Sequence, residues 1–354
     1  MKAIIAEPPK RDSVKLVEIP KPLPAKGQVL LKTLRIGIDG TDREISEGIY
    51  GTPPNGSRYL VLGHETVAKI EEIGDQVESF SEGDLVVPTV RRPCKENCLN
   101  CRIGESDMCL TGNYFEHGIY KLHGFASEYA VSDANFLIKI PTELENLAVL
   151  LEPLSIAEKA VTQSFKIQER MVWEPKKAFV VGAGSLGLLA TMILRLKGLK
   201  VYVAATREKE SLKAKIVRRV GGTYINVRET PIGTLEEKFD LVIEATGRVE
   251  VALEALNLLG PNSVMCFLGI YREKKACEEF GKVLTTMVLG NRLMFGSVSS
   301  NKSHFERGIK DMSEIKRRYK DVLNKLITKK LYLTDFEQAF KSDREEIKTV
   351  IYFK

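Results

Sequence analysis

The alternation of apolar and polar positions sets the first 130 residues apart from the rest of the chain. Short alternating segments are separated there by glycines and prolines, as in β-strands joined by turns. The clearest of these segments are residues 2–7, 28–37, 64–74 and 83–90. We therefore predict a β-rich N-terminal region.

From about residue 175, apolar runs alternate with amphipathic stretches of helical period. The runs predicted as strands are AFVVG (178–182), KVYVAA (200–205), TYIN (223–226), FDLVIEA (239–245), SVMCFLG (263–269) and RLMFGSV (292–298). The predicted helices between them are residues 185–198, 210–222 and 249–260. Alternating β and α units predict a parallel, doubly wound sheet and the α/β fold class.

The alternation stops after Ser299. A helical region is predicted from there to about Lys330, and residues 346–353 form a predicted final strand. This order indicates a β-rich domain that is interrupted by an inserted α/β domain. The predicted domains are residues 1–172, residues 173–299, and residues 300–354 as a return to the first domain.

Composition narrows the class of protein. The 354 residues are 44% hydrophobic and 28% charged, which is typical of a globular protein with real cores. No apolar run reaches the roughly twenty residues of a membrane span, and the N-terminus turns polar too early for a signal peptide. We therefore expect a cytoplasmic protein without a membrane partner. The net charge is +6, but the densest basic cluster, residues 316–330, has the spacing of a solvated helix face rather than of a nucleic-acid site.

Four cysteines lie within sixteen residues, with the spacing C-x3-C-x2-C-x7-C. They are Cys94, Cys98, Cys101 and Cys109. Four thiolates this close can surround a tetrahedral structural zinc, and in a cytoplasmic protein metal ligands are favoured over disulfides. We predict a zinc lobe over about residues 91–112.

A glycine-rich turn follows the strand predicted at 178–182. Gly182, Gly184 and Gly187 form G-x-G-x-x-G, with Ser185 and Leu186 between the last two. This motif is weak alone, but here it follows a strand and opens a helix, the context of a dinucleotide-binding site. The helix N-terminus would then face the pyrophosphate.

The end of the next strand indicates which dinucleotide binds. Thr206 and Arg207 stand where NAD-binding proteins have an acidic residue for the ribose. A hydroxyl and a guanidinium can instead bind a 2′-phosphate, so NADP is favoured. Glu208 follows at once, and use of NAD as well stays open.

A second metal site is less clear from spacing alone. Asp39, His64, Glu65 and Glu152 could hold a catalytic zinc with one position left for water or substrate. They are far apart in the sequence, and from spacing alone solvated acids with a buried, hydrogen-bonded histidine explain them better.

Five motifs occur together and in a characteristic order: GxDGTDxE, GHE, the four-cysteine lobe, LxEPLS and VVGAGxxG. With the strings VVPTVRRP, FEHGIYKLHGF, EPLSIAEKA and EIKTVI, the whole chain resembles the archaeal glucose 1-dehydrogenases, a group of zinc-dependent medium-chain dehydrogenases. The resemblance implies a GroES-like catalytic domain with an inserted Rossmann domain. It also implies two zinc ions per chain, one structural and one catalytic.

The resemblance also implies roles for individual residues. Asp39 matches a position that is Cys in most members, so the catalytic zinc would be bound less tightly and other divalent ions admitted. His64 matches the imidazole ligand, and Glu65 and Glu152 match carboxylates at or near the zinc, with the direct ligand left open. Glu152 would also contact the sugar. Asp42 matches an acid that orients the histidine.

Further positions match residues at the substrate and the cofactor. Thr41 matches the hydroxyl that begins a proton relay, and Glu116 matches a residue that contacts glucose hydroxyls. Ser299, a predicted cofactor contact, stands where some relatives have Asn. Val90 and Ile156 also depart from the residues of some relatives, which leaves the exact sugar open.

The implied enzyme oxidises C1 of an aldose to the aldonolactone by zinc-assisted hydride transfer to NADP or NAD. D-Glucose is the expected substrate, with D-galactose and related sugars as alternatives. Another zinc-dependent alcohol or polyol dehydrogenase, or a non-catalytic NADPH-binding protein of this fold, are the rival interpretations. The family resemblance suggests a homo-oligomer, either a dimer or a tetramer.

Overall fold

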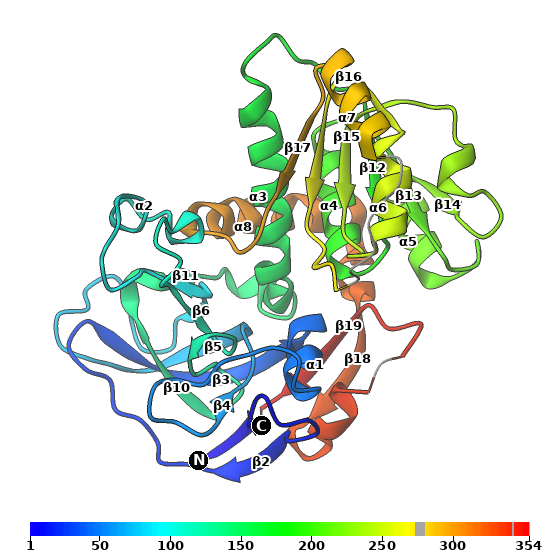
Figure 1. The fold of residues 1–354 in the computed structure, drawn as a ribbon. Helices are drawn as coiled ribbons and strands as arrows, with labels where there is room; N and C mark the ends of the chain where they lie inside the picture. The colour runs from blue at the N-terminus through cyan, green and yellow to red at the C-terminus, as the bar shows by residue number, and fades with distance from the viewer. Residues whose placement is uncertain (273–279, 342, 354) are drawn as a thin grey trace. The chain divides into compact units, whose positions relative to one another are not determined.

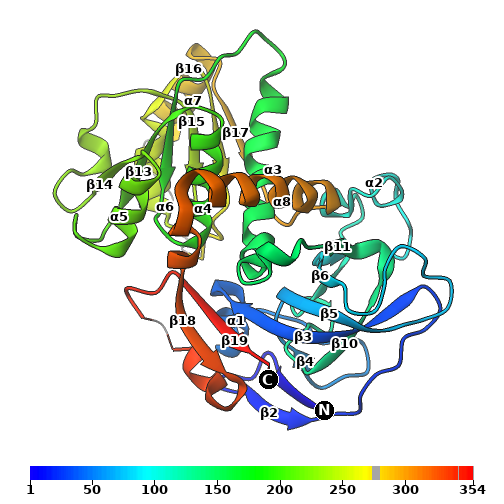
Figure 2. The same ribbon diagram turned by 180° about the vertical axis from the view of Figure 1, so that it is seen from behind.

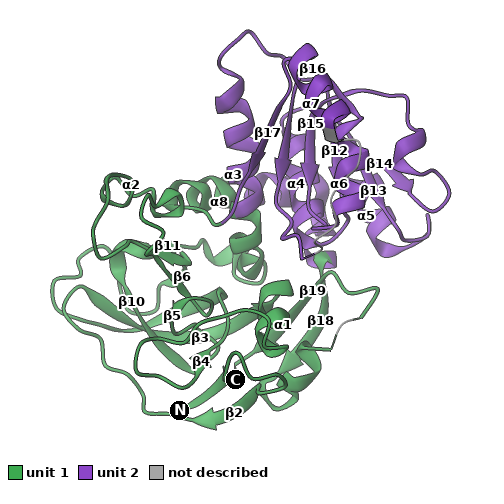
Figure 3. Ribbon diagram, in the orientation of Figure 1, with its two compact units in different colours: residues 1–155, 299–310, 326–354 green, residues 156–298, 311–325 purple. Residues whose placement is uncertain are grey.

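The computed structural model describes residues 1–272, 280–341 and 343–353, which form two compact units (Figure 3). Unit 1 comprises residues 1–155, 299–310 and 326–354, and unit 2 comprises residues 156–298 and 311–325. Helices α3 (Leu151–Gln168) and α8 (Lys302–Tyr319) begin in unit 1 and end in unit 2. No helix within the described ranges has both the length and the apolar character that crossing a membrane requires. The domain boundaries predicted at 172/173 and 299/300 stay predictions.

Unit 1 is built from β-strands. They are β1 (Lys2–Ala6), β2 (Lys15–Glu18), β3 (Gln28–Ile38), β4 (Leu60–Val61), β5 (Glu65–Ile73), β6 (Leu85–Pro88), β7 (Arg91–Arg92), β8 (Phe115–His117), β9 (Lys121–Leu122), β10 (Tyr129–Asp133), β11 (Leu137–Lys139), β18 (Ile327–Tyr332) and β19 (Lys348–Tyr352). The largest sheet has the order β11-β6-β5-β3-β19-β18, and β10 also pairs with β3. Strand β3 therefore joins the N-terminal strands to the C-terminal ones.

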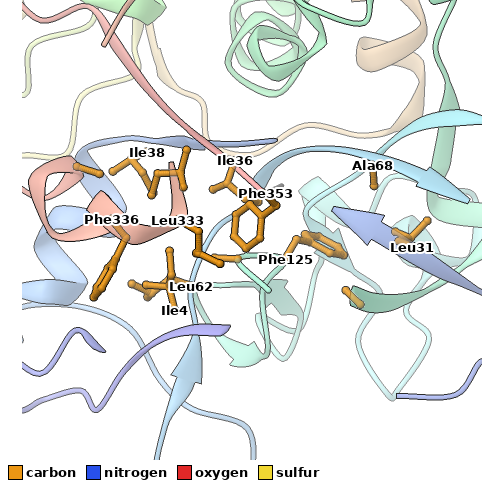
Figure 4. Packing of buried hydrophobic residues seen from close by; sticks show 14 of the residues in the cluster. Ile4, Leu31, Ile36, Ile38, Leu62, Ala68, Phe125, Leu333, Phe336 and Phe353 are labelled. Carbon is orange, nitrogen blue, oxygen red and sulfur yellow. The ribbon is translucent and has the colours of Figure 1, made fainter. Parts of the chain in front are cut away.

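The core of unit 1 lies against this sheet. Phe125 and the C-terminal residues Leu333, Phe336 and Phe353 pack with side chains of β1, β3 and β5 in one buried cluster (Figure 4). The last residues of the described chain are thus part of the same core as the first strand. Burying these large side chains contributes roughly 1.5–3 kcal/mol each.

Short helices fill the connections. Unit 1 also contains α1 (Gly40–Ser46) and α2 (Leu99–Arg102). The 3-10 helices of the chain are Ser106–Met108, Ala134–Phe136, Thr142–Leu144, Ala148–Leu150, Ile232–Thr234, Lys320–Val322, Asn324–Leu326 and Leu333–Ala339. Helix α1 matters most here, because it starts at one of the predicted metal ligands.

Unit 2 is a parallel six-stranded sheet with the order β14-β13-β12-β15-β16-β17 (Figures 1 and 2). The strands are β12 (Lys177–Val181), β13 (Lys200–Ala205), β14 (Thr223–Asn226), β15 (Phe239–Glu244), β16 (Leu259–Phe267) and β17 (Leu293–Gly296). The helices are α4 (Ser185–Leu196), α5 (Leu212–Arg219), α6 (Val249–Leu256) and α7 (Phe280–Leu289). The strand order reverses at β12, which is where a doubly wound sheet binds its ligand.

Helices cover both faces of this sheet. On β12, Val180 faces Gly187 of α4, while its neighbours Phe179 and Val181 pack in one cluster with Leu256 of α6. Successive residues of a strand point to opposite faces, so α4 and α6 lie on opposite sides. The predicted combination of a β-rich domain and a doubly wound parallel sheet is confirmed.

Three details of the predicted elements need correction. The helix expected up to Lys330 ends at Tyr319, because Lys320 adopts a left-handed backbone (φ 55°) and residues 327–332 alternate with the period of a strand. Strand β16 begins at Leu259, so the preceding helix is shorter than predicted. Helices α1, α3 and α7 were not anticipated by the pattern.

Candidate active site

Asp39 is fixed by the start of helix α1. Its Oδ1 accepts a hydrogen bond from the Asp42 amide at 3.0 Å, and Asp42 Oδ2 accepts one from the Asp39 amide at 3.2 Å. This reciprocal capping box is the local reason that the sequence DGTD begins a helix. Thr41 Oγ1 donates to Asp39 Oδ2 at 3.2 Å, which leaves both carboxylate oxygens oriented.

His64 lies beside this capping box. Its Nε2 is 3.6 Å from Asp39 Oδ2, and its Nδ1 is 3.9 Å from Asp42 Oδ1, which is too long for a hydrogen bond. Nδ1 is buried and has no hydrogen-bond partner among the described residues. The orienting role of Asp42 therefore stays a prediction. Burial disfavours both charges, but mutual attraction lowers the pKa of Asp39 and raises that of His64.

Glu65 forms a buried ion pair that the sequence did not reveal. Lys348 Nζ on β19 donates to both Glu65 oxygens at 2.6 Å, and the two side chains are only 3% and 2% exposed. Burial raises the pKa of Glu65, and the nearby ammonium opposes that shift. A Cβ at Gly37, which is opposite Glu65 on β3, would lie 2.1 Å from Glu65 Oε2. Glycine is therefore required there to make room for the carboxylate.

Glu152 adds a further carboxyl group from the first turn of α3. Burial raises its pKa to about 8, and the charges of Glu65 and Asp39 add to the shift while His64 opposes it. Three of these residues bring a possible ligand atom within 4.8 Å of the other two: Asp39, His64 and Glu65. Glu152 is not part of that set.

The donors of this cluster suit a divalent cation. Four buried or half-buried carboxyl groups, those of Asp39, Asp42, Glu65 and Glu152, face one ammonium and one imidazole. This excess of acid is costly without a further positive charge. Oxygen donors with one imidazole nitrogen are also ligands that zinc accepts. The residues present therefore fit a metal ion.

Glu116 lies on β8, opposite Arg91 on β7. Its Oε1 accepts a hydrogen bond from Arg91 Nε at 2.9 Å and lies 2.9 Å from Nη2 of the same guanidinium in an ion pair, and both side chains are buried. The guanidinium also covers the Tyr114 ring at 3.7 Å and donates to the carbonyl oxygen of Asp107 at 2.9 Å. Sequence analysis missed Arg91, although two adjacent arginines in an apolar strand were a visible signal.

The four cysteines meet in the loop between β7 and β8. Their four sulfur atoms lie within 4.8 Å of one another, and none of the four cysteines forms a disulfide. The Leu110 amide donates to Cys98 Sγ and the Cys98 amide to Cys94 Sγ, both at 3.4 Å. Backbone donors lower the pKa of Cys98 to about 6, so thiolate is favoured. Burial instead raises the pKa of Cys101 to about 12, so it is the mutual distance of the four sulfurs that fits a tetrahedral zinc.

The glycine motif shapes the turn from β12 into α4. Gly182 has φ 106°, which only glycine adopts readily, and a Cβ at Gly187 would lie 2.0 Å from the Gly182 carbonyl oxygen. Ser185 and Leu186 lie in the first turn of α4. The buried Ser185 Oγ has no hydrogen-bond partner among the described residues, so it can still bond a ligand.

A cavity of about 220 Å³ adjoins this turn within unit 2. It is lined by Gly182 and Gly184 and by Thr206 and Arg207 at the end of β13. Lys213 and Arg248 also line it, and sequence reasoning did not select them because each is one basic residue among many. Ser299 belongs to unit 1, where it is buried with a left-handed backbone (φ 58°).

Two sequence families match this chain. "Alcohol dehydrogenase GroES-like domain" matches residues 25–142, and "Glucose dehydrogenase C-terminus" matches residues 145–353. A GroES-like β domain with an inserted dinucleotide-binding sheet defines a medium-chain dehydrogenase. The second match covers more than half of the chain. The chain therefore belongs to the glucose dehydrogenase family and is an enzyme.

Individual relatives agree along the full length. Glucose 1-dehydrogenase 1 of Caldivirga maquilingensis is 46% identical, covering 99% of this chain and 98% of the relative. The glucose 1-dehydrogenase of Methanocella arvoryzae is 43% identical with 99% coverage of both chains. A structure of Haloferax mediterranei glucose dehydrogenase in complex with NADP, Zn and gluconolactone has a TM-score of 0.93 at 36% identity, covering 100% of this chain and 99% of that one.

We predict that Lys348→Met lowers the free energy of unfolding by about 3–5 kcal/mol, because it leaves the Glu65 carboxylate buried and unpaired. Denaturant unfolding measures the change. The control is Lys139→Met, whose ammonium is 61% exposed in its pair with Asp84 and should contribute at most about 1 kcal/mol. The double variant Glu65→Gln/Lys348→Met should recover most of the loss. Equal losses of unfolding free energy in Lys348→Met and Lys139→Met would contradict this account.

Proposed function

We propose that this enzyme oxidises C1 of an aldose to the aldonolactone and reduces NADP, with D-glucose as its principal substrate. In the reaction the sugar loses a hydride from C1 and a proton from the C1 hydroxyl. The main support is the full-length similarity to the Haloferax enzyme that binds NADP, Zn and gluconolactone, in a chain that keeps Asp39, His64 and Glu152 as possible metal ligands. D-Galactose is the alternative sugar.

The rival functions predict different residues or substrates. A non-catalytic NADPH-binding protein has no need for an excess of buried carboxyl groups around an imidazole, because buried charges are costly. A dehydrogenase of simple alcohols would not need the buried Glu116–Arg91 pair, whereas a polyol dehydrogenase is separated from an aldose dehydrogenase only by its substrates. Such a pair suits a polyhydroxylated substrate, since a missing hydroxyl would leave a buried polar group unpaired.

Asp39, His64 and Glu152 would hold the catalytic zinc. Glu65 lies within reach, but both of its oxygens already accept from Lys348 Nζ, so we favour Glu152 as the third ligand. When bound, the zinc would supply a Lewis acid that stabilises negative charge on the sugar oxygen. The nicotinamide ring would supply the hydride acceptor.

Thr41 would handle the proton. Its hydroxyl donates to Asp39 Oδ2, so the lone pairs of Thr41 Oγ1 remain available to accept the proton of the C1 hydroxyl. A general base must be within hydrogen-bond reach of the proton it takes, and Thr41 is only two residues from a proposed metal ligand. As it accepts that proton, the hydroxyl would turn from Asp39 and release its own proton through the nicotinamide ribose of the bound cofactor toward solvent.

The remaining contacts are proposed for each unit in turn. Glu116, held by Arg91, and Glu152 would bind sugar hydroxyls. The glycine turn with Ser185 and Leu186 would bind the pyrophosphate, Ser299 would contact the cofactor, and Thr206 and Arg207 would bind the 2′-phosphate. Use of NAD as a weaker alternative is compatible with this pocket. The four cysteines would hold a second, structural zinc.

Initial rates on a substrate panel test the function. We expect glucose with NADP to give the highest kcat/KM among glucose, galactose, xylose, the polyol sorbitol and ethanol, each measured with NADP and NAD. Ethanol should be turned over poorly, because it offers no hydroxyls to Glu116. A preference for ethanol or a polyol over every aldose would overturn the proposal.

The metal site is tested by two substitutions that separate its chemistry from the helix cap. Asp39→Asn keeps a good N-cap but removes the anionic ligand, so zinc and activity should be lost while stability is kept. Asp39→Cys keeps a zinc ligand and softens it, so zinc should leave more slowly in EDTA, while loss of the cap should cost about 1 kcal/mol. Zinc analysis, activity and thermal unfolding are the measurements.

In the parent enzyme, brief EDTA treatment should abolish activity before the four-thiolate zinc is lost, and added zinc should restore it. Cys101→Ser is the matched control for the second zinc, and should lower thermal stability more than turnover. An enzyme that holds one zinc or none and still oxidises glucose at the full rate would show that the assigned site is wrong.

Exposed apolar residues of unit 2 support the proposed homo-oligomer. Leu284, Val288 and Leu289 of α7 are 48%, 76% and 79% exposed, and β17 is the edge strand of the described sheet. Such surfaces commonly mediate association. We expect light scattering to give the mass of a dimer or tetramer, and Leu289→Lys to lower it. A monomeric parent protein would contradict this.

A further inference from the structure

A tyrosine of unit 2 holds the residue that we propose binds the 2′-phosphate of NADP. Arg207 follows β13, and Tyr224 lies on the neighbouring parallel strand β14. Tyr224 Oη accepts a hydrogen bond from the Arg207 amide at 3.1 Å and donates one to the Arg207 carbonyl oxygen at 2.8 Å. One phenol therefore bonds both backbone polar groups of this arginine.

The position of this contact follows from the strand register. Tyr224 pairs with Val203, and the ladder between the strands ends with the Val227 amide donating to the Ala205 carbonyl oxygen at 2.9 Å. Residues 206–211 then leave the sheet as bends and turns. The Arg207 backbone is beyond the ladder, so the side chain of Tyr224 takes the place of a strand partner.

The same loop is held again further along. Arg218 Nη2 donates to the carbonyl oxygen of Lys209 at 2.6 Å, and Lys209 pairs with Glu229 at 2.5 Å. These two contacts fix the far side of the loop. Tyr224 is the residue that fixes the near side, at the arginine itself.

We infer that Tyr224 is a positioning residue that determines preference for NADP over NAD. It acts by holding the Arg207 backbone, so that the guanidinium stays at the cavity that Thr206 and Lys213 also line. Without these two hydrogen bonds, phosphate binding would have to order the loop around Arg207, and ordering a residue costs conformational entropy. NAD has a hydroxyl in place of the phosphate and would bear little of that cost. This inference rests on the proposed phosphate contact of Arg207.

Tyr224→Phe is the direct test, since it keeps the ring and removes both hydrogen bonds. Calorimetry with adenosine 2′,5′-bisphosphate and with 5′-AMP separates the phosphate from the rest of the nucleotide. We expect the Kd of the bisphosphate to rise about threefold to tenfold, the effect of about one hydrogen bond. The Kd of 5′-AMP should stay within about twofold, which also shows that the variant is folded. In steady-state assays, KM for NADP should rise with kcat unchanged.

A double-mutant cycle with Arg207→Ala shows whether Tyr224 acts through Arg207. In the Arg207→Ala background, Tyr224→Phe should have no further effect on bisphosphate binding. Tyr202→Phe is the control, because that ring packs against Phe239 in the same sheet at 5.2 Å. It should leave both affinities unchanged.

The outcomes separate this inference from the proposed function. Equal weakening of both nucleotides by Tyr224→Phe would indicate a general structural role and overturn the inference. The inference would also be overturned if Tyr224→Phe left the Kd of the bisphosphate unchanged while Arg207→Ala weakened bisphosphate binding. In that case the proposed contact between Arg207 and the phosphate would still stand. If Arg207→Ala has no effect on bisphosphate binding, the proposed phosphate contact fails, and the inference fails with it.

Discussion

The structure of unit 1 depends on keeping several carboxyl groups inside a protein interior. An isolated carboxylate is so costly to bury that it would take up a proton or destabilise the fold around it. Three of the four acids are therefore tied to a specific partner: Asp39 and Asp42 bond each other's amides, and Glu65 pairs with Lys348. The charge that these partners leave over is what a divalent cation can balance. The same few side chains thus start helix α1, fix strand β19 beside the sheet and offer ligands for a metal.

Glu116, which we propose binds sugar, is connected to the four-cysteine loop through Arg91. Arg91 bonds Glu116, covers Tyr114 and reaches the carbonyl oxygen of Asp107, which lies between Cys101 and Cys109. A well-ordered cysteine loop therefore also orders a carboxylate that we propose binds sugar. A structural zinc in this loop would then have a role beyond stability, because it would limit the movement of Glu116.

Much of this was predictable from periodicity and short motifs. The strands and helices of the parallel sheet follow alternating patterns, and the glycine turn and the four cysteines are local in sequence. What sequence patterns missed is non-local. Lys348 lies 283 residues from Glu65, and only a lone lysine in an apolar final strand hinted at it. Strand β18 was predicted as helix, because its lysine-rich sequence has no strong preference until it pairs with β19.

The pairing of Glu65 with Lys348 also sets an order of assembly during synthesis. Glu65 emerges from the ribosome early, but the lysine that neutralises it is made 283 residues later. The strand that carries this lysine, β19, completes the sheet beside β3. A nascent chain that stops before residue 348 therefore has an open sheet and an uncompensated acid at its centre.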